Sequence, residues 1–172
     1  RDFCLSRGLG DVYKRQDVIR AVVSMVTTSS LCPNNLGQAL VTPYLEDGTL
    51  ERVCRETLTP FYRGQAEFAL SLLPELFGES IPWRVHKSEG AMFLWLWFEG
   101  LPITCQELYE RCKARGCFVN PGHHFFFALP EEGEPWPHRH ECIRISFTQT
   151  EELLRKGLSI VADEVKKAYS HS

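Results

Sequence analysis

Three side chains that can bind a metal ion stand at alternate positions of the segment PWPHRHECIRIS: His138, His140 and Cys142. Imidazole nitrogen and thiolate sulfur are ligands that zinc prefers, and His123 or His124 could complete a set of four. The spacing argues against zinc, because extended residues spread along the chain at about 3.3 Å each and paired spacings such as Cys-x-x-Cys are absent. We interpret these histidines as polar residues beside a cleft and keep a metal-binding module as the weaker alternative.

Arg144 in the same segment has a different chemistry. Period-two alternation puts Ile143, Ile145 and Phe147 on one face of a strand, and Arg144 and Ser146 on the other. A guanidinium group stays charged at any working pH and forms paired hydrogen bonds with a carboxylate. On a rigid strand it is suited to binding a substrate carboxylate, while a structural ion pair at a strand edge is the simpler alternative.

No nucleophile is obvious in the sequence. Beyond residue 16, the lysines fall on predicted helix exteriors or beside a turn, and none has an apolar setting that would lower its pKa: Lys87, Lys113, Lys156, Lys166 and Lys167. A Gly-x-Ser-x-Gly elbow, a phosphate-binding glycine loop and a His-Glu-x-x-His motif are all missing from the sequence.

Helices and strands alternate in the elements that must position these residues. The patterns predict a helix in DVIRAVVSMVTTSS, one over 36–45, one over 50–76 interrupted at Pro60, one in ITCQELYERCKARG with a Thr104–Glu107 capping box, and one from about Glu151. Strands are predicted in WRV, FLWLWF, CFV and CIRISF. Because FLWLWF is apolar throughout, we expect it to be covered on both faces. The fold class is α/β, a small sheet packed with helices.

Composition excludes several classes of partner. The 172 residues are 44% hydrophobic with a net charge of −3, which suits a globular core and offers no basic surface for nucleic acid. The longest apolar run, AMFLWLWF, is far shorter than the roughly 20 residues that span a bilayer. Seven scattered cysteines and the lack of an apolar signal sequence indicate reduced thiols in a cytoplasmic protein.

Four motifs in this order carry a resemblance to a known family: HKSEGAMFLWLWFEGLPIT, ELYERCKARG, VNPGHHFF and PWPHRHECIRIS. From Asp17 to the C-terminus the chain resembles the valine-pyruvate aminotransferase family, fold-type I enzymes that depend on pyridoxal 5'-phosphate. The resemblance implies a homodimer that transfers an amino group between an L-amino acid, valine or alanine, and a 2-oxo acid, pyruvate or 2-oxoisovalerate. Another superfamily member, such as a transcription regulator with an aminotransferase-like domain, is the alternative.

The resemblance also implies roles for particular residues. Arg144 matches the arginine that binds the substrate's α-carboxylate. Two turns would lie near the substrate pocket, and their residues are Gly90, Ala91, Asn120, Pro121 and Gly122. Ser88 stands where a proline is usual and Ala91 where a second glycine is common, so the shape of the pocket wall can differ from that of the wider family. The aromatic residues 125–127 would help to close the site.

The resemblance divides the chain into three parts. Residues 1–16, ending in VYKRQ like a translated library adapter, are predicted to be a non-native tail. Residues 17–47 would be the end of the large domain that binds the cofactor, and residues 48–172 the small domain. The Schiff-base lysine and the phosphate-binding residues would lie upstream of Asp17. We therefore expect this polypeptide by itself to be an inactive C-terminal fragment.

Overall fold

A computed structural model of the chain describes residues 16–30, 35–126 and 136–170. The chain divides into two compact units, Arg1–Arg52 and Val53–Ser172. The tail predicted to be non-native lies outside the described residues, apart from Gln16. The expected boundary between the large and small domains, after residue 47 of this chain, stays a prediction.

The N-terminal unit contains helices α2 (Gln16–Ser30) and α3 (Leu36–Glu46), close to their predicted bounds. Large apolar side chains on both helices are exposed, including Val22, Met25, Leu36 and Leu40. No described residue of either helix is buried, so this unit has no apolar core within the part of the chain that the structure describes. None of the described helices is long and apolar enough to cross a membrane.

A long helical segment leads into the C-terminal unit and is interrupted where the sequence predicts. Helix α4 (Thr49–Val53) is followed by the π-helical turn η1 (Cys54–Leu58) and by helix α5 (Thr59–Phe77). Pro60 stands in the first turn of α5. Proline lacks the N–H that a regular helix interior needs, which accounts for a break in the regular pattern at this point. Gly78 ends the helix with a φ of 68°, as predicted.

The sheet has four antiparallel strands in the order β1-β2-β4-β3. They are β1 (Trp83–Val85), β2 (Phe93–Phe98), β3 (Asn120–Pro121) and β4 (Cys142–Ser146). The strand predicted in CFV is wrong: residues 117–119 form no strand, and pairing begins at Asn120. Strand β3 is two residues long, and its place depends on its pairing with β4, which the local pattern of CFV does not contain.

The remaining elements are α6 (Cys105–Ala114), the 3₁₀ turns η2 (Gly122–Phe125) and η3 (Pro137–His140), and α7 (Glu151–Ser170). Thr104 caps α6 as predicted, because its hydroxyl accepts a hydrogen bond from the Glu107 N–H at 3.2 Å. Gly116 follows the helix with a φ of 79°.

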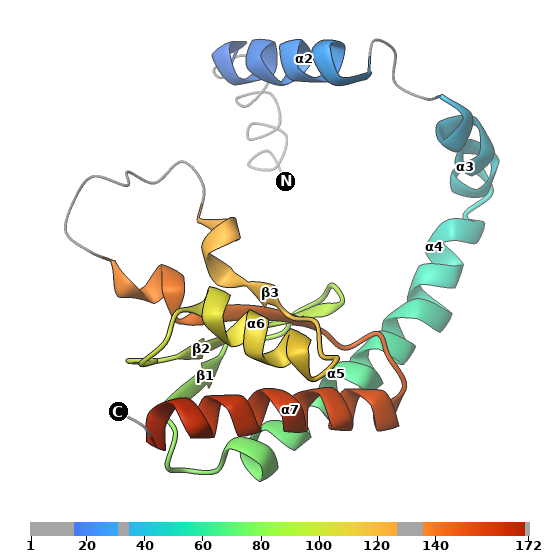
Figure 1. The fold of residues 1–172 in the computed structure, drawn as a ribbon. Helices are drawn as coiled ribbons and strands as arrows, with labels where there is room; N and C mark the ends of the chain where they lie inside the picture. The colour runs from blue at the N-terminus through green and yellow to red at the C-terminus, as the bar shows by residue number, and fades with distance from the viewer. Residues whose placement is uncertain (1–15, 31–34, 127–135, 171–172) are drawn as a thin grey trace, which may run out of the picture. The chain divides into compact units, whose positions relative to one another are not determined.

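Helices α5, α6 and α7 share one apolar core with a single face of the sheet (Figure 1). Leu94, Leu96 and Phe98 of β2 belong to this core together with Ile143 and Ile145 of β4. The expectation that β2 is covered on both faces is wrong for the described residues. Its other face carries Phe93, which is 38% exposed, and the half-buried rings of two tryptophans, because side chains rather than a helix lie against it.

Candidate functional site

Arg144 lies at the centre of the sheet. Strand β4 pairs with β2 on one side and β3 on the other, so Arg144 stands opposite both Trp95 and Asn120. Its neighbours Ile143 and Ile145 are buried in the helix-covered face, as the alternation predicts. The half-buried Arg144 side chain therefore belongs to the opposite face, against which the described residues place no α-helix of the core.

Two aromatic rings hold the guanidinium group of Arg144. Its Cζ lies 4.2 Å from the ring centroid of Phe93 and 4.5 Å from that of Phe125. The Nε atom is buried without a hydrogen-bond partner, and no ion pair of Arg144 occurs among the described residues. Stacking on rings fixes the plane of a guanidinium while its N–H groups stay directed outward in that plane. This arrangement suits an incoming carboxylate.

Further aromatic side chains line the same face. The Trp95 ring centroid lies 5.5 Å from that of Phe125 and 5.8 Å from that of Phe126, while the centroids of Phe126 and Trp136 are 5.1 Å apart. The sequence predicts such a cluster for residues 125–127, of which residue 127 lies outside the described part. These rings limit the water around Arg144 and so strengthen electrostatic contacts there.

The turn after β3 approaches β4 very closely. Asn120 pairs with Arg144 and Pro121 with Ile143. A Cβ atom at Gly122 would lie 2.5 Å from the carbonyl oxygen of Cys142, a separation that no side chain can accommodate without a shift of backbone. Gly122 thus allows η2 to begin directly against β4, and η2 is the element that carries Phe125 over Arg144.

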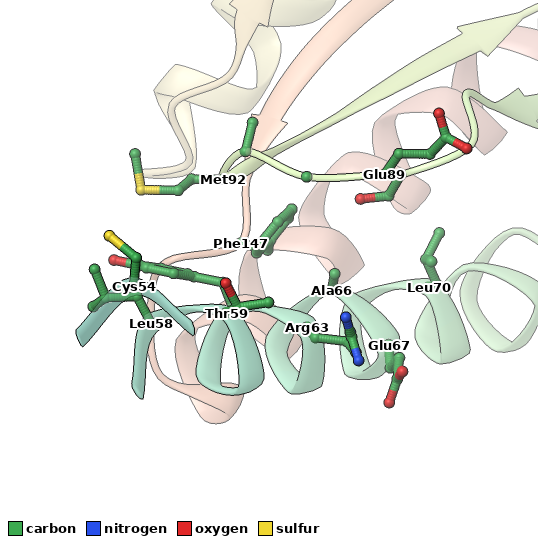
Figure 2. Close-up of a pocket in the computed structure, with 14 residues that line it drawn as sticks. Cys54, Leu58, Thr59, Arg63, Ala66, Glu67, Leu70, Glu89, Met92 and Phe147 are labelled. Atoms are coloured by element: carbon green, nitrogen blue, oxygen red, sulfur yellow. The ribbon is translucent and has the colours of Figure 1, made fainter. Parts of the chain in front are cut away.

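Gly90 and Ala91 lie in a different place. They line a cavity of about 560 Å³ between residues 88–92 and the helical segment formed by η1 and α5 (Figure 2). Ala91 has a φ of 62°, a conformation that favours glycine. Arg144 does not line this cavity, so the structure brings Asn120 beside Arg144 but places Gly90 and Ala91 at a cavity that Arg144 does not reach.

The three possible metal ligands His138, His140 and Cys142 separate into two groups. His138 contacts Cys142, with 3.6 Å between Nε2 and Sγ, and its ring centroid lies 4.7 Å from that of Trp97. His140 instead stacks on His123, with 5.9 Å between centroids. The expectation that these residues lead in an extended line into β4 is wrong, because residues 137–140 form a 3₁₀ turn that sends successive side chains in different directions.

Sequence reasoning missed the cysteine that completes the second group. Cys105 Sγ lies 3.3 Å from His123 Nδ1, and potential ligand atoms of Cys105, His123 and His140 all lie within 4.8 Å of one another. Burial lowers the pKa of His123, and electrostatic interactions with His124, His140 and Arg139 lower it further. Burial raises the pKa of the Cys142 thiol to about 12, so that thiol is neutral at pH 7.

The described lysines do not offer a buried amine. Lys87 pairs with Glu89, Lys113 with Glu110 at 3.7 Å, and Lys167 with Glu164 at 2.8 Å. Lys156 and Lys166 are also exposed. Within the described ranges the chain therefore supplies a candidate carboxylate anchor but no lysine suited to hold an aldehyde cofactor.

The chain is similar in sequence and in structure to known aminotransferases. The chain is 35% identical over 163 residues, 95% of its length, to valine-pyruvate aminotransferase of Escherichia coli strain K12. It matches the crystal structure of valine-pyruvate aminotransferase from Salmonella typhimurium LT2 with a TM-score of 0.75 and 35% identity over 91% of the chain. The chain folds as the C-terminal domain of a fold-type I aminotransferase. The resemblance inferred from the four motifs is thereby confirmed.

This aminotransferase domain spans only part of its relatives. It covers 38% of the E. coli protein and 39% of the Salmonella chain. A kynurenine aminotransferase from Pyrococcus horikoshii, whose structure is in complex with PMP, matches with a TM-score of 0.65 and 26% identity over 88% of this chain and 35% of its own. These relatives are aminotransferases that use pyridoxal phosphate. No protein-family model matches the chain.

Proposed function

We propose that Arg144 of this aminotransferase domain binds the α-carboxylate of an amino-acid or 2-oxo-acid substrate. One observation supports this above all: the guanidinium is held between two rings, with no carboxylate paired to it among the described residues. A substrate carboxylate would supply the missing partner through two parallel charged hydrogen bonds. The surrounding aromatic side chains orient the group and limit its contact with water.

For the whole enzyme we propose transfer of an amino group between valine or alanine and pyruvate or 2-oxoisovalerate. The names of the E. coli and Salmonella relatives support this substrate class. When bound, pyridoxal phosphate would supply the electron sink that such a transfer requires. The described residues contribute substrate binding and orientation, and the amine that holds the cofactor would come from sequence outside them.

The role of Arg144 is tested in the whole enzyme, which would contain this domain together with the domain that carries the Schiff-base lysine. We expect Arg144→Lys to lower kcat/KM by about 100-fold, since losing a two-point charged contact costs about 3 kcal/mol. Arg84→Lys is the matched control, because Arg84 lies on strand β1 and pairs with Glu99 at the surface. Equal activity of Arg144→Lys and Arg84→Lys would contradict the proposal.

The proposal that the cofactor is held by sequence outside the described residues is tested on the 172-residue chain alone. We expect no stable protein-bound absorption band when pyridoxal phosphate is added at one equivalent, because each described lysine is exposed. A stable band that survives gel filtration would show that the chain holds the cofactor by itself. In that case the proposed separation between anchor and cofactor site is wrong.

We also propose that the whole enzyme is a cytoplasmic homodimer. Free thiols support a reducing compartment, because Cys54, Cys105, Cys112, Cys117 and Cys142 form no disulfide among the described residues. The exposed apolar side chains of α2 and α3 are candidates for burial in a larger assembly. Analytical ultracentrifugation of the whole enzyme tests the dimer, and a monomer at micromolar concentration would exclude it.

A further inference from the structure

One cluster of soft ligands has no part in the proposed carboxylate site. Cys105 is the first residue of α6, His123 lies in η2 and His140 ends η3, so three separate elements meet there. The Cys105 side chain is fully buried, and the two histidines are half-buried. Their ligand atoms lie within 4.8 Å of one another, with the closest pair, Cys105 Sγ and His123 Nδ1, at 3.3 Å.

These distances are close to those of a tetrahedral metal site. With metal bonds of about 2.3 Å to sulfur and about 2.0 Å to nitrogen, the ligand atoms of a zinc site lie roughly 3.5 Å apart. The Cys105–His123 pair is already near this value, and His140 would have to approach by at most about 1.3 Å, the difference between 4.8 and 3.5 Å, within the range of side-chain adjustment. One thiolate and two imidazoles are a ligand set that borderline divalent ions favour over magnesium or calcium.

We propose that Cys105, His123 and His140 form a binding site for a zinc-like divalent transition-metal ion, with the fourth position left to water. Binding displaces the Cys105 thiol proton to solvent and leaves the thiolate as the sulfur ligand. The positive charge of Arg139 acts on His123 and repels a cation, so we expect a weaker affinity than that of a site with four cysteines.

The ion would connect three parts of the fold. It would join the start of α6 to η2 and η3, and η2 carries Phe125 over Arg144. Because the metal binds the folded arrangement and fixes these turns, loading should raise the melting temperature by several degrees. This proposal does not depend on the proposed carboxylate-binding role of Arg144, since the rings that contact its guanidinium are those of Phe93 and Phe125 and not those of the two histidine ligands.

Cobalt provides a direct readout on the 172-residue chain. After reduction and removal of metals, titration with Co²⁺ should give one equivalent of bound ion, a thiolate-to-cobalt charge-transfer band, and visible bands of a four-coordinate site. Zn²⁺ should then displace the cobalt and remove these bands. Absence of a stoichiometric cobalt complex in the folded wild-type chain would overturn the proposal.

Variants identify the ligands. We expect Cys105→Ser and His140→Asn each to weaken cobalt binding by more than about 100-fold, the most that loss of an outer-sphere partner usually costs. His140 is half-buried, so His140→Asn keeps the test decisive if Cys105→Ser fails to fold. Matched controls are Cys117→Ser, whose thiol contacts Gly157, and His86→Asn at the surface, and both should bind as the wild type does.

Cys142→Ser separates this site from the other possible one. Cys142 and His138 contact each other and would be the ligands if the alternating residues of the sequence bound the metal together. Cobalt binding that is lost in Cys142→Ser and kept in Cys105→Ser would overturn the assignment. Binding that is lost in Cys105→Ser, with its charge-transfer band, and kept in Cys142→Ser supports it.

Discussion

The two faces of the sheet in the C-terminal unit are made by alternate residues of the same strands and have opposite properties. On the helix-covered face, Leu96 and Ile143 are fully buried in a core shared with α5, α6 and α7. On the open face, the neighbouring Trp95 and Arg144 both contact Phe125 of the short turn η2. Adjacent residues of one strand therefore have different roles: one packs in the core, and the next lies on the face that carries the candidate binding site.

The difference indicates what each face contributes. Close packing against three helices makes the covered face sensitive to any change of volume. Among the described residues, the open face is covered by side chains of β2 and of short turns, and it keeps a charged group without an ion-pair partner. We expect substitutions on the covered face to change stability, and substitutions on the open face to change binding.

The largest effect is expected from removing volume on the covered face. Ile143→Ala should lower the free energy of unfolding by about 2–5 kcal/mol, because it leaves a cavity beneath the helices. Urea denaturation followed by circular dichroism measures it, and Ile143→Val, with an expected loss of about 1 kcal/mol, is the graded control. A loss below about 1 kcal/mol for Ile143→Ala would contradict close packing of Ile143 against the helices.

The next largest effect is expected at Gly122, where η2 begins directly against β4. Gly122→Ala should lower the free energy of unfolding by about 1–3 kcal/mol, because the new methyl group overlaps the Cys142 carbonyl. Gly90→Ala is the matched control, since no atom lies within 4 Å of a Cβ added there. Similar thermal shifts in Gly122→Ala and Gly90→Ala would contradict the close approach.

The third prediction concerns Glu164, the one buried charged residue among those that the structure describes. Glu164 of α7 receives hydrogen bonds from Lys167 and Arg115, both at 2.8 Å. The contact with Lys167 lowers the pKa of Glu164 below 4.5 most strongly, and Arg115 adds to this. A lowered folded-state pKa gives stability that is complete above pH 4.5 and is lost as pH falls through the lowered pKa.

We therefore expect Glu164→Gln to cost about 1–2 kcal/mol at pH 7 and progressively less below pH 4.5, where the wild type loses the same contribution. Unfolding free energies measured from pH 3 to pH 7 follow the difference between the two proteins. Glu152→Gln, at an exposed position of the same helix, controls for a general charge effect. A difference that is independent of pH would exclude the ionic contribution.

The smallest effect is expected in the turn that leads into β2. Ala91→Gly should raise the free energy of unfolding by up to about 1 kcal/mol. Glycine removes the strain of the left-handed backbone conformation at residue 91, and we expect this gain to exceed the loss that comes from the greater conformational entropy of glycine in the unfolded chain. Ala114→Gly in α6 has the opposite expectation, a loss of about 1 kcal/mol. If both substitutions destabilise equally, the left-handed conformation at Ala91 is not strained.

The sequence predicted the features that depend on neighbouring residues. The break at Pro60, the Thr104 cap and the alternation around Arg144 follow from hydrogen-bonding needs and side-chain periodicity within a few positions. The motifs also carried the family resemblance, which the similar proteins confirm. Arg144 as a carboxylate ligand remains a prediction with a supporting geometry.

Tertiary structure decided which distant segments meet. Strand β3 is too short to show a period, and its position follows from pairing with β4. The partner of His140 is His123 with Cys105 rather than Cys142, because the 3₁₀ turn breaks the extended line that the spacing suggested. The sequence by itself determined which face each residue of a strand occupies, since that depends on local geometry. Only packing between elements determined what stands opposite that residue, because such contacts join segments whose separation along the chain carries no local pattern.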